Sequence, residues 1–598
     1  MKNQFFLTLV ITLFLGIKPG LAWPLPMIFP ASDTNIDGIT LPIPFGKIEK
    51  KSLIRIGTDS QITFKTIGMG TKLNSKKIIA QGAPLHGTNG LMFGSDNYLY
   101  IASVVGREIV VMNPKTGKIL RRLGIDQGVE GPDDLVFGPD GSLYWTSYLT
   151  GEVGRLSPDG QKSTVAQLVP GVNGITFSDD GRLFVSLVSL ADALYELDPE
   201  GKDPPRLISA NLGGFDGIAF GPDGFLYGAL CFRNQVARID VDTGSITTVA
   251  DGFDVPSAVK FDSHGHLYVT DSRNGEVVCV DVNSGNKKVI ARLTPVLDNL
   301  AFNQNDQLFV SNTSEGSIDE VLPDGTTRTL SKGGMILPGG VAVLPRPHGG
   351  ESVFVADLWS LRTFNGSTGR QEDIERHVIG FSAMAAPLTV SPDGSNLILS
   401  SFESNAVQVW NPDTHQVVEN YSDVAMPINA IRFQGELVAA ELMTGSVIRL
   451  SDGTPLASGL TIPAGLAATK DTLWVGDWAT GVVWQVASNG QPISVPIPVA
   501  TGLSNPEGLA VETQESLLVI EAGAARLSRI DLVSGKVSPV AENLKLGAQA
   551  VPGTPPTWAF NGVAVSPSGT IYVTSDIDNV LYQIKTHSLF RLHTLNGL

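Results

Sequence analysis

Twelve imperfect copies of one short pattern run through this chain of 598 residues. The clearest copies read NGITFSDDGRLFVS from Asn173, DGIAFGPDGFLYGA from Asp216 and NGVAVSPSGTIYVTS from Asn561. Weaker copies begin at nine other positions: Asn89, Asp133, Ser257, Asp298, Gly339, Ala386, Asn429, Ala464 and Glu507. The mean spacing is about 43 residues, and repeats of roughly 40 to 50 residues with four short strands each are typical of a β-propeller.

The number of repeats predicts two rings rather than one. A propeller ordinarily has about four to eight blades, so twelve blades exceed a single ring. We therefore expect an all-β chain of twelve four-stranded blades, arranged as two tandem six-bladed β-propellers. The first ring is expected over residues 82–334 and the second over residues 335–598, with the boundary in the stretch SKGGMILPGG.

Residues 171–210 show how one blade is expected to fold. NGITF would form the innermost strand, SDDG a hairpin turn, RLFVSLV the second strand, ALYELD the third and PPRLISA the outermost. Asp140, Asp180, Asp223 and Asp393 precede glycine in the first hairpin of their blades. Asp favours such turns because its side chain bonds nearby backbone groups, so we expect these four residues to do no chemistry.

The N-terminal 81 residues lie outside the repeats. Residues 1–22 are typical of a secretory signal peptide, with Lys2, the apolar run FFLTLVITLFLGI and small residues before a cleavage site. We therefore expect secretion or a periplasmic location, and no later segment is long enough for a membrane span. Residues 23–81 form an extension in which KKIIAQG resembles an outermost strand, and we expect this strand to close the first ring.

Composition restricts the partners. The net charge is −17 and no Lys/Arg-rich run is present, which argues against nucleic acid and anionic membrane surfaces. A small-molecule substrate or a protein or glycan ligand remains. The chain has only two cysteines, Cys231 and Cys279, so it is not a disulfide framework. Free thiols are favoured for this pair, and a bridge stays open.

The start of each innermost strand should face the mouth of the central channel. In the first ring all six residues at this position carry a side-chain oxygen: Asn89, Asp133, Asn173, Asp216, Ser257 and Asp298. In the second ring only half of them do: Gly339, Ala386, Asn429, Ala464, Glu507 and Asn561. The contrast indicates that the first ring is the active one.

Carboxylates held close together repel one another unless a cation lies among them. Hard cations take about six to eight oxygen ligands from carboxylates, amides and water, so the first ring is expected to hold one divalent cation. Ca²⁺ is favoured, with Mg²⁺, Mn²⁺ or Zn²⁺ as alternatives. A second interpretation also stays open, in which the Asn and Asp side chains only bond backbone groups around a water-filled channel.

Other residues are expected on the same rim. Glu130 lies three residues before Asp133 and is a further candidate ligand, while His86 lies three before Asn89 and is a candidate proton carrier. Tyr148, Phe232 and Arg233 follow the second strands of their blades, and we expect them to wall the substrate site.

The stretch from Val129 to Gly244 resembles the SMP-30/gluconolactonase family. The resemblance rests on Glu130-Gly131-Pro132, Asn173-Gly174 and Asp216-Gly217, and on FDGIAFGPDGFLYGALCFRNQVARIDVDTG. It implies that Glu130, Asn173 and Asp216 bind a divalent cation and that Asp298 or Asp133 acts as acid or base. Asn89, from its place on the same rim, is a further candidate ligand. The repeat itself is equally similar to NHL-type, streptogramin lyase and strictosidine synthase propellers.

Three functions remain from the sequence. The first is a secreted, metal-dependent hydrolase of a lactone or ester. The second is a metal-dependent lyase of the streptogramin-lyase type, which would use the same cation to stabilise an enolate-like intermediate. The third is a non-catalytic propeller scaffold that binds a protein, a glycan or a natural-product pathway partner.

Overall fold

The computed structural model describes residues 75–378, 380–552 and 554–586, which fall in one compact unit. The expected signal peptide and nearly all of the extension over 23–81 lie outside the described residues. Across the described ranges, no helix has both the length and the apolar character that crossing a membrane requires.

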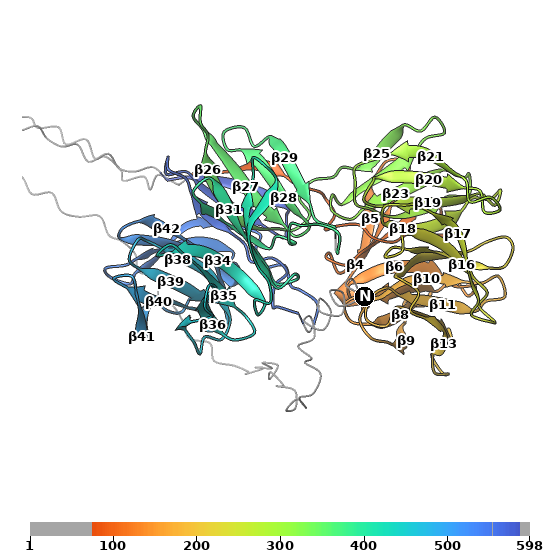
Figure 1. Ribbon diagram of the computed structural model, residues 1–598, viewed down its shortest axis with the longest axis horizontal. Coiled ribbons are helices and arrows are strands. Elements are labelled where there is room, and N and C mark those ends of the chain that lie inside the picture. Colours follow the sequence, from red (N-terminus) through yellow and green to blue (C-terminus); the bar gives the residue numbers. More distant parts are fainter. Residues whose placement is uncertain (1–74, 379, 553, 587–598) are drawn as a thin grey trace, which may run out of the picture. The chain divides into compact units, whose positions relative to one another are not determined.

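The described residues form twelve four-stranded antiparallel sheets, and these confirm the all-β propeller fold (Figure 1). The first six sheets are consecutive in sequence, coloured from orange to light green. Their strands are β2 (Leu91–Phe93), β3 (Leu99–Ser103), β4 (Glu108–Met112), β5 (Ile119–Leu123); β6 (Pro132–Phe137), β7 (Leu143–Ser147), β8 (Glu152–Leu156), β9 (Lys162–Gln167); β10 (Val172–Phe177), β11 (Leu183–Leu187), β12 (Ala193–Leu197), β13 (Arg206–Ala210); β14 (Phe215–Phe220), β15 (Leu226–Leu230), β16 (Gln235–Ile239), β17 (Ile246–Asp251); β18 (Pro256–Phe261), β19 (Leu267–Asp271), β20 (Glu276–Val280), β21 (Lys287–Arg292); and β22 (Leu297–Phe302), β23 (Leu308–Asn312), β24 (Ser317–Val321), β25 (Thr327–Ser331).

The other six sheets follow in green to blue, with one strand taken from the start of the described chain. Their strands are β26 (Pro338–Pro345), β27 (Glu351–Asp357), β28 (Ser360–Asn365), β29 (Gln371–Arg376); β30 (Thr389–Asp393), β31 (Asn396–Ser401), β32 (Ala406–Asn411), β33 (Gln416–Tyr421); β34 (Pro427–Phe433), β35 (Glu436–Glu441), β36 (Ser446–Arg449), β37 (Pro455–Ala457); β38 (Pro463–Ala468), β39 (Leu473–Asp477), β40 (Val482–Ser488), β41 (Gln491–Ala500); β42 (Pro506–Thr513), β43 (Ser516–Glu521), β44 (Arg526–Asp531), β45 (Val537–Glu542); and β46 (Val563–Val565), β47 (Ile571–Ser575), β48 (Val580–Lys585), β1 (Ser75–Gln81). Two short 3₁₀ turns, η1 (Ile125–Gln127) and η2 (Ala522–Ala524), complete the described elements.

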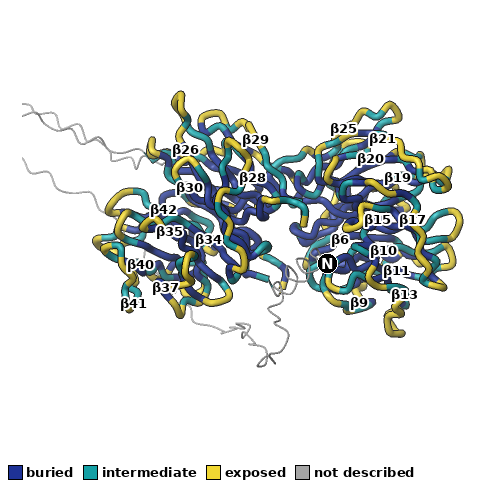
Figure 2. The backbone as a smooth tube through the Cα atoms, in the orientation of Figure 1, coloured by how far each residue is buried: buried dark blue, intermediate teal, exposed yellow. Residues whose placement is uncertain are grey.

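Contacts between innermost strands divide the sheets into two closed rings of six. In the first ring β2 contacts both β6 and β22, and in the second β26 contacts both β30 and β46. Within a blade, the inner strands are buried and the outermost strand is largely exposed, as β10 and β13 illustrate. Figure 2 shows this gradient as dark blue inner strands and yellow outer segments and turns. Both faces of each sheet are therefore buried against neighbouring blades, which explains the dense apolar alternation of the repeats.

The first ring is closed by a repeated aromatic pair. At each of its six blade interfaces, an aromatic residue of a second strand meets the phenylalanine that ends or nearly ends a neighbouring inner strand, with ring centroids 5.0–5.4 Å apart and edge-to-face geometry. The pairs are Tyr100–Phe137, Tyr144–Phe177, Phe184–Phe220, Tyr227–Phe261, Tyr268–Phe302 and Phe309–Phe93. Such pairs contribute about 0.5–1.5 kcal/mol each beyond their burial.

The second ring is closed by a strand from the start of the described chain. The expectation that this strand closes the first ring was wrong. The segment KKIIAQ lies in β1, which pairs with β48 from Ser75–Lys585 to Gln81–Val580. It therefore completes the last blade of the second ring rather than the first. The whole first ring is inserted between this strand and the rest of the second ring. The strand's own alternation of apolar residues could not reveal a partner about 500 residues away.

Two of the four hairpin aspartates bond nearby backbone groups as the turn pattern predicts, and the other two bond side chains. Asp140 accepts a hydrogen bond from Ser142 N at 3.0 Å and Asp223 from Phe225 N at 3.3 Å. Asp180 accepts from the hydroxyl of Ser178, and Asp393 pairs with Arg432. Cys231 and Cys279 are free thiols.

Candidate functional site

A recurring break in strand pairing builds the mouth of the first ring. β6 pairs with β7 at Pro132 and next at Leu135, so Asp133 and Asp134 lie in an irregular stretch between the two pairs. The same shift recurs at the corresponding place in β10, β14, β18 and β22. A bulge re-aims side chains and leaves backbone groups unpaired. The predicted mouth residues of these five blades all lie at this bulge.

Hydroxyl groups of the second strands bond the bulged backbone of the neighbouring blade. Ser186 donates to Asp216 O at 3.3 Å, Thr270 to Asp298 O at 3.1 Å, and Ser311 to Asn89 O at 2.7 Å. Thr146 donates to Asn173 O in the same way. These bonds fix the mouth residues around the ring. The Ser or Thr in LYWTS, LFVSL, LYVTD and LFVSN was the signal in the sequence, and it was missed.

The structure brings all six predicted mouth residues of the first ring to one cavity of about 290 Å³. Asp133, Asp216 and Asp298 supply three carboxyl groups to its wall, and the described residues that line it include no Lys or Arg. A cavity lined by several acids and by no Lys or Arg favours a cationic or metal-bound occupant.

Burial and neighbouring carboxylates raise the pKa of all three carboxyl groups. Burial and the charges of Asp298, Asp216 and Asp134 hold the pKa of Asp133 well above its ordinary value. Burial, followed by Asp298 and Asp134, does the same for Asp216. Burial and Asp134 raise the pKa of Asp298 to about 7, although a hydrogen bond from Asn89 opposes the shift. These groups therefore hold protons near neutral pH, or require a cation to balance their charge.

Asp134 lies beneath the mouth and was not singled out from the sequence. Its carboxylate accepts from Leu135 N at 2.9 Å and from the Asn299 amide at 3.3 Å. A Cβ on Gly90 would lie 2.4 Å from Asp134 Oδ1, so this position requires glycine. Burial raises the pKa of Asp134, and the charge of Lys260 opposes the shift. The DD pair in VEGPDD was the available signal.

The amide and hydroxyl groups of the mouth are not equally available to a ligand. Asn89 Oδ1 accepts from Val104 N at 3.2 Å, and its amide nitrogen donates to Thr313 and Asp298. Ser257 bonds Thr270 and the Leu297 carbonyl. In the described part of the chain, the side chain of Asn173 makes no hydrogen bond. Asn173 can therefore offer its amide oxygen, whereas Asn89 presents N–H groups and does not suit the predicted role of metal ligand.

Glu130, His86 and Arg233 lie away from the cavity wall, contrary to expectation. Glu130 forms a two-point ion pair with Arg107, with distances of 2.5 and 2.7 Å. His86 Nε2 lies 3.0 Å from the carbonyl oxygen of Asp576 in the second ring, and burial lowers its pKa.

Glu130 and His86 have partners that sequence spacing does not reveal. In the sequence, the strands β4 and β5 lie between Arg107 and Glu130. Arg107 also donates to Gln549 O of the second ring. Arg233 donates to Asn211 O at 2.7 Å and is exposed. The other two predicted wall residues, Tyr148 and Phe232, do line the cavity.

The second ring supplies the rest of the wall, including a fourth carboxyl group. Glu403, which follows β31, lines the cavity, and burial raises its pKa to about 7 against a hydrogen bond from Trp359. His377 lines it too, with Nδ1 2.7 Å from Met384 O, and burial lowers its pKa. His377 lies in a long connection between blades, and Glu403 lies in the same turn of its blade as Leu149 does, but the repeat does not show that the second ring faces the first mouth.

The second ring has a different mouth, and its sequence-based register was wrong in two blades. A backbone bond from the glycine after each mouth residue marks the register: Gly90 N donates to Asp133 O, and Gly340 N likewise to Leu388 O. Leu388 therefore takes the place predicted for Ala386. Asn429 accepts from Leu466 N as Asp134 does from Ile175 N, which puts Ile428 at the mouth instead.

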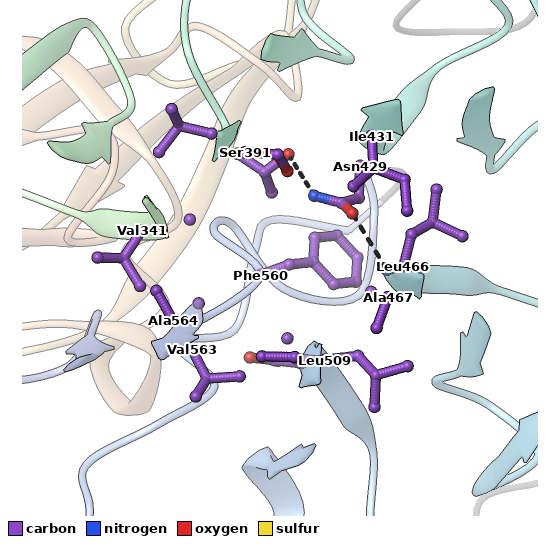
Figure 3. Close-up of a pocket in the computed structure, with 18 of the residues that line it drawn as sticks. Val341, Ser391, Asn429, Ile431, Leu466, Ala467, Leu509, Phe560, Val563 and Ala564 are labelled. Atoms are coloured by element: carbon purple, nitrogen blue, oxygen red, sulfur yellow. Dashed lines mark hydrogen bonds between the residues drawn. The ribbon is translucent and has the colours of Figure 1, made fainter. Parts of the chain in front are cut away.

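Apolar residues occupy much of this second mouth, and the channel of the second ring holds its own cavity of about 290 Å³. Leu388, Ile428 and Ala464 belong to one buried cluster with Phe560 and Trp558. Figure 3 shows the Phe560 ring in the middle of the second channel, among Leu466, Leu509 and Val563. Of the remaining mouth residues, Asn561 donates to Glu507 through both its backbone and side-chain nitrogens at 2.8 Å. Burial raises the pKa of Glu507 to about 8.

The first mouth fits a hard cation if amide oxygen and water share the coordination. Among the described residues, no group of three or more His, Cys, Asp or Glu side chains is arranged to hold one metal ion. Asp133, Asp216 and Asp298 nevertheless interact strongly, and Asn173 offers an unused amide oxygen. Ca²⁺ accepts such mixed oxygen shells. The candidate donors are thus Asp133, Asp216 and Asn173, completed by water, without Glu130 or Asn89.

Comparisons with known proteins give solved structures of the same architecture. No family model matches the chain, and no curated protein matches it. A streptogramin B lyase is similar at 17% identity over 47% of this chain and 95% of that one, with a TM-score of 0.36. A gluconolactonase from Xanthomonas campestris is similar at 16% identity over 40% and 87%, with a TM-score of 0.34.

One solved structure covers most of the chain. The extracellular domain of a protein described as a hybrid two component system from B. thetaiotaomicron matches 86% of this chain and 83% of its own, at 11% identity and a TM-score of 0.31. The identities and TM-scores are too low to transfer an activity, and the fold rests on the sheets themselves.

Proposed function

We propose that the chain is a divalent-cation-dependent hydrolase of a lactone or ester, of the kind found in the SMP-30/gluconolactonase family, with its site at the first ring's mouth. The observation that supports this proposal most is the gathering of Asp133, Asp216 and Asp298 on one cavity whose described lining has no Lys or Arg. Such a set of acids is costly without a cation.

The residues divide the work by their surroundings. Asp133, Asp216 and Asn173 would hold the cation, which would polarise a substrate carbonyl and lower the pKa of a water molecule. Asp298 and Glu403, which line the same cavity, would accept and return a proton. Glu403 takes the role first assigned to His86, which lies away from the cavity.

The test is turnover of phenyl acetate, δ-valerolactone and glucono-δ-lactone by the full chain. Protein treated with EDTA is compared with protein resupplied with Ca²⁺, Mg²⁺, Mn²⁺ or Zn²⁺. We expect hydrolysis that needs one of these ions and falls about 100-fold or more in Asp216→Asn. The matched control is Asp223→Asn, in the hairpin turn of the same blade, which should keep full activity.

The outcomes separate the candidate functions. Absence of turnover for every ester and lactone, with every ion, would contradict the hydrolase and leave the scaffold. Release of an elimination product instead of a hydroxy acid would replace the hydrolase by a lyase that uses the same residues. Turnover indifferent to both EDTA and Asp216→Asn would remove the cation from the proposal.

A further inference from the structure

The cavity at the first mouth has two chemically different halves. Its floor is the acidic mouth of the first ring, and its wall comes from loops of both rings. The apolar part of that wall from the second ring consists of Leu358, Trp359, Phe381, Phe402, Pro552 and Trp558. The first ring adds apolar lining of its own, including Val105, Leu149 and Phe232.

The apolar wall is packed in place against the first ring. The ring of Phe381 stacks on that of Phe232, with centroids 6.2 Å apart and planes inclined by 16°. Val378 and Phe381 pack on a buried group of Val188, Cys231 and Val255 from the first ring. Aromatic stacking of this kind fixes position as well as burying area.

Buried ion pairs hold the two rings at the same junction. Arg362, fully buried, pairs with Asp357 at 2.6 Å and donates to Ser314 O of the first ring and to Gly334 O of the connecting region. Glu315 of the first ring pairs with Arg362 and Arg376 at 3.3 and 2.6 Å. The wall is therefore a built part of the cavity in the described chain.

The wall selects against highly polar ligands. A hydroxyl group buried against apolar side chains without a hydrogen-bond partner loses its bonds to water and gains none in return, so each such group weakens binding. The described lining contains no Lys or Arg to meet a carboxylate or phosphate on the ligand. Tyr148, one of the few polar groups on the wall, already bonds Ser189.

We infer that the substrate is a small, uncharged and predominantly apolar lactone or ester, with its carbonyl at the acidic floor and an alkyl or aryl group against the second ring. This inference rests on the proposed function and adds the substrate class. It predicts that the second ring is part of the binding site and that sugar lactones are poor ligands.

The experiment measures binding of lactones to the full chain with Ca²⁺ from the change in tryptophan fluorescence, so that turnover is not needed. δ-Valerolactone, δ-decalactone and glucono-δ-lactone all contain a six-membered lactone ring, and each is mixed with the protein in stopped flow so that binding is recorded before any hydrolysis. δ-Decalactone should bind about 100-fold more tightly than either of the others, since it buries five more methylene or methyl groups than δ-valerolactone. Phe381→Ala should lower the ratio of the affinity for δ-decalactone to that for δ-valerolactone about 10-fold, and Phe381→Leu should keep most of the wild-type ratio.

Phe225→Ala is the control, because Phe225 is also half-buried but lies outside the cavity. Binding of δ-decalactone without hydrolysis would support the substrate class while contradicting the hydrolase. Hydrolysis of glucono-δ-lactone with equal or tighter binding than δ-decalactone would overturn the substrate class and leave the hydrolase. Equal loss of affinity for all three lactones in Phe381→Ala would also overturn it.

Discussion

The two rings share a repeated backbone but have opposite mouths. In the first ring the bulged positions carry three carboxyl groups that face a cavity. In the second ring the matching positions carry Leu388, Ile428 and Ala464, which are buried in an apolar cluster. The repeat thus determines where six side chains converge. The identity of those side chains decides whether they form an acidic cavity or an apolar cluster.

The rings also differ in how they close. The first uses six edge-to-face aromatic pairs, whereas the second uses β1 from the other end of the chain. Closure by β1 ties the first ring into the second as an insertion. This arrangement keeps the loops of the second ring beside the acidic mouth, where they form part of the wall of the first ring's cavity.

Removing Ser75–Gln81 should give the largest loss of stability, and it should open only the second ring. Because that ring would lose a whole outer strand with about six backbone hydrogen bonds, its free energy of unfolding should fall by more than about 5 kcal/mol. Hydrogen exchange should show lost protection in β46–β48 and retained protection in β6–β21. Equal loss in both rings would contradict the separate closures.

Phe560→Ala should have the next largest effect on stability, because it removes a buried phenylalanine ring from the apolar cluster at the second mouth. Phe560 is 2% exposed within the apolar cluster. Truncating a buried phenylalanine costs about 3–5 kcal/mol, which urea denaturation would measure. The matched change in the first mouth, Asp133→Asn, should not destabilise the metal-free protein at pH 8, since it relieves repulsion. Similar losses from both variants would show that the two mouths are alike.

The smallest expected effect is the pH dependence of the metal-free protein. Asp298 titrates near its ordinary value of 3.8 when unfolded and at about 7 when folded, so the folded chain binds the extra proton between these values. Its contribution to stability is therefore complete below pH 3.8 and is lost as the pH rises through 7. A fall of about 3–6 °C in Tm between pH 5 and pH 8 is expected from the first mouth.

Two comparisons check this pH dependence. Asp298→Asn should lessen the fall in Tm, because the group that loses its proton is gone. Added Ca²⁺ should raise Tm more at pH 8 than at pH 5, since only ionised carboxylates bind it. A Tm that rises from pH 5 to pH 8 without added metal, and responds to neither change, would contradict the raised pKa values.

Much of the architecture could be predicted from the repeat, since turn residues and alternation recur in every blade. The mouth residues Asp133, Asn173, Asp216 and Asp298 were found because they directly precede or occupy the bulge. The second mouth was misplaced at Ala386 and Asn429, where extra loop residues break the spacing that the register depends on.

What the sequence could not show are contacts between distant segments. β1 finds its partner strand at the other end of the chain. Glu403 and Phe381 reach the first mouth from loops of the second ring, and the repeat does not show that the second ring faces this mouth. Glu130 matched a family motif, yet its carboxylate pairs with Arg107. Local motifs therefore predicted the floor of the site, and tertiary structure supplied its wall.

Calorimetric titration of Ca²⁺ into EDTA-treated protein tests the difference between the two mouths most directly. The account predicts one bound ion per chain, lost in Asp216→Asn at the first mouth and retained in Glu507→Gln at the second. Absence of binding by the wild-type chain, or binding that Glu507→Gln removes and Asp216→Asn leaves intact, would contradict it.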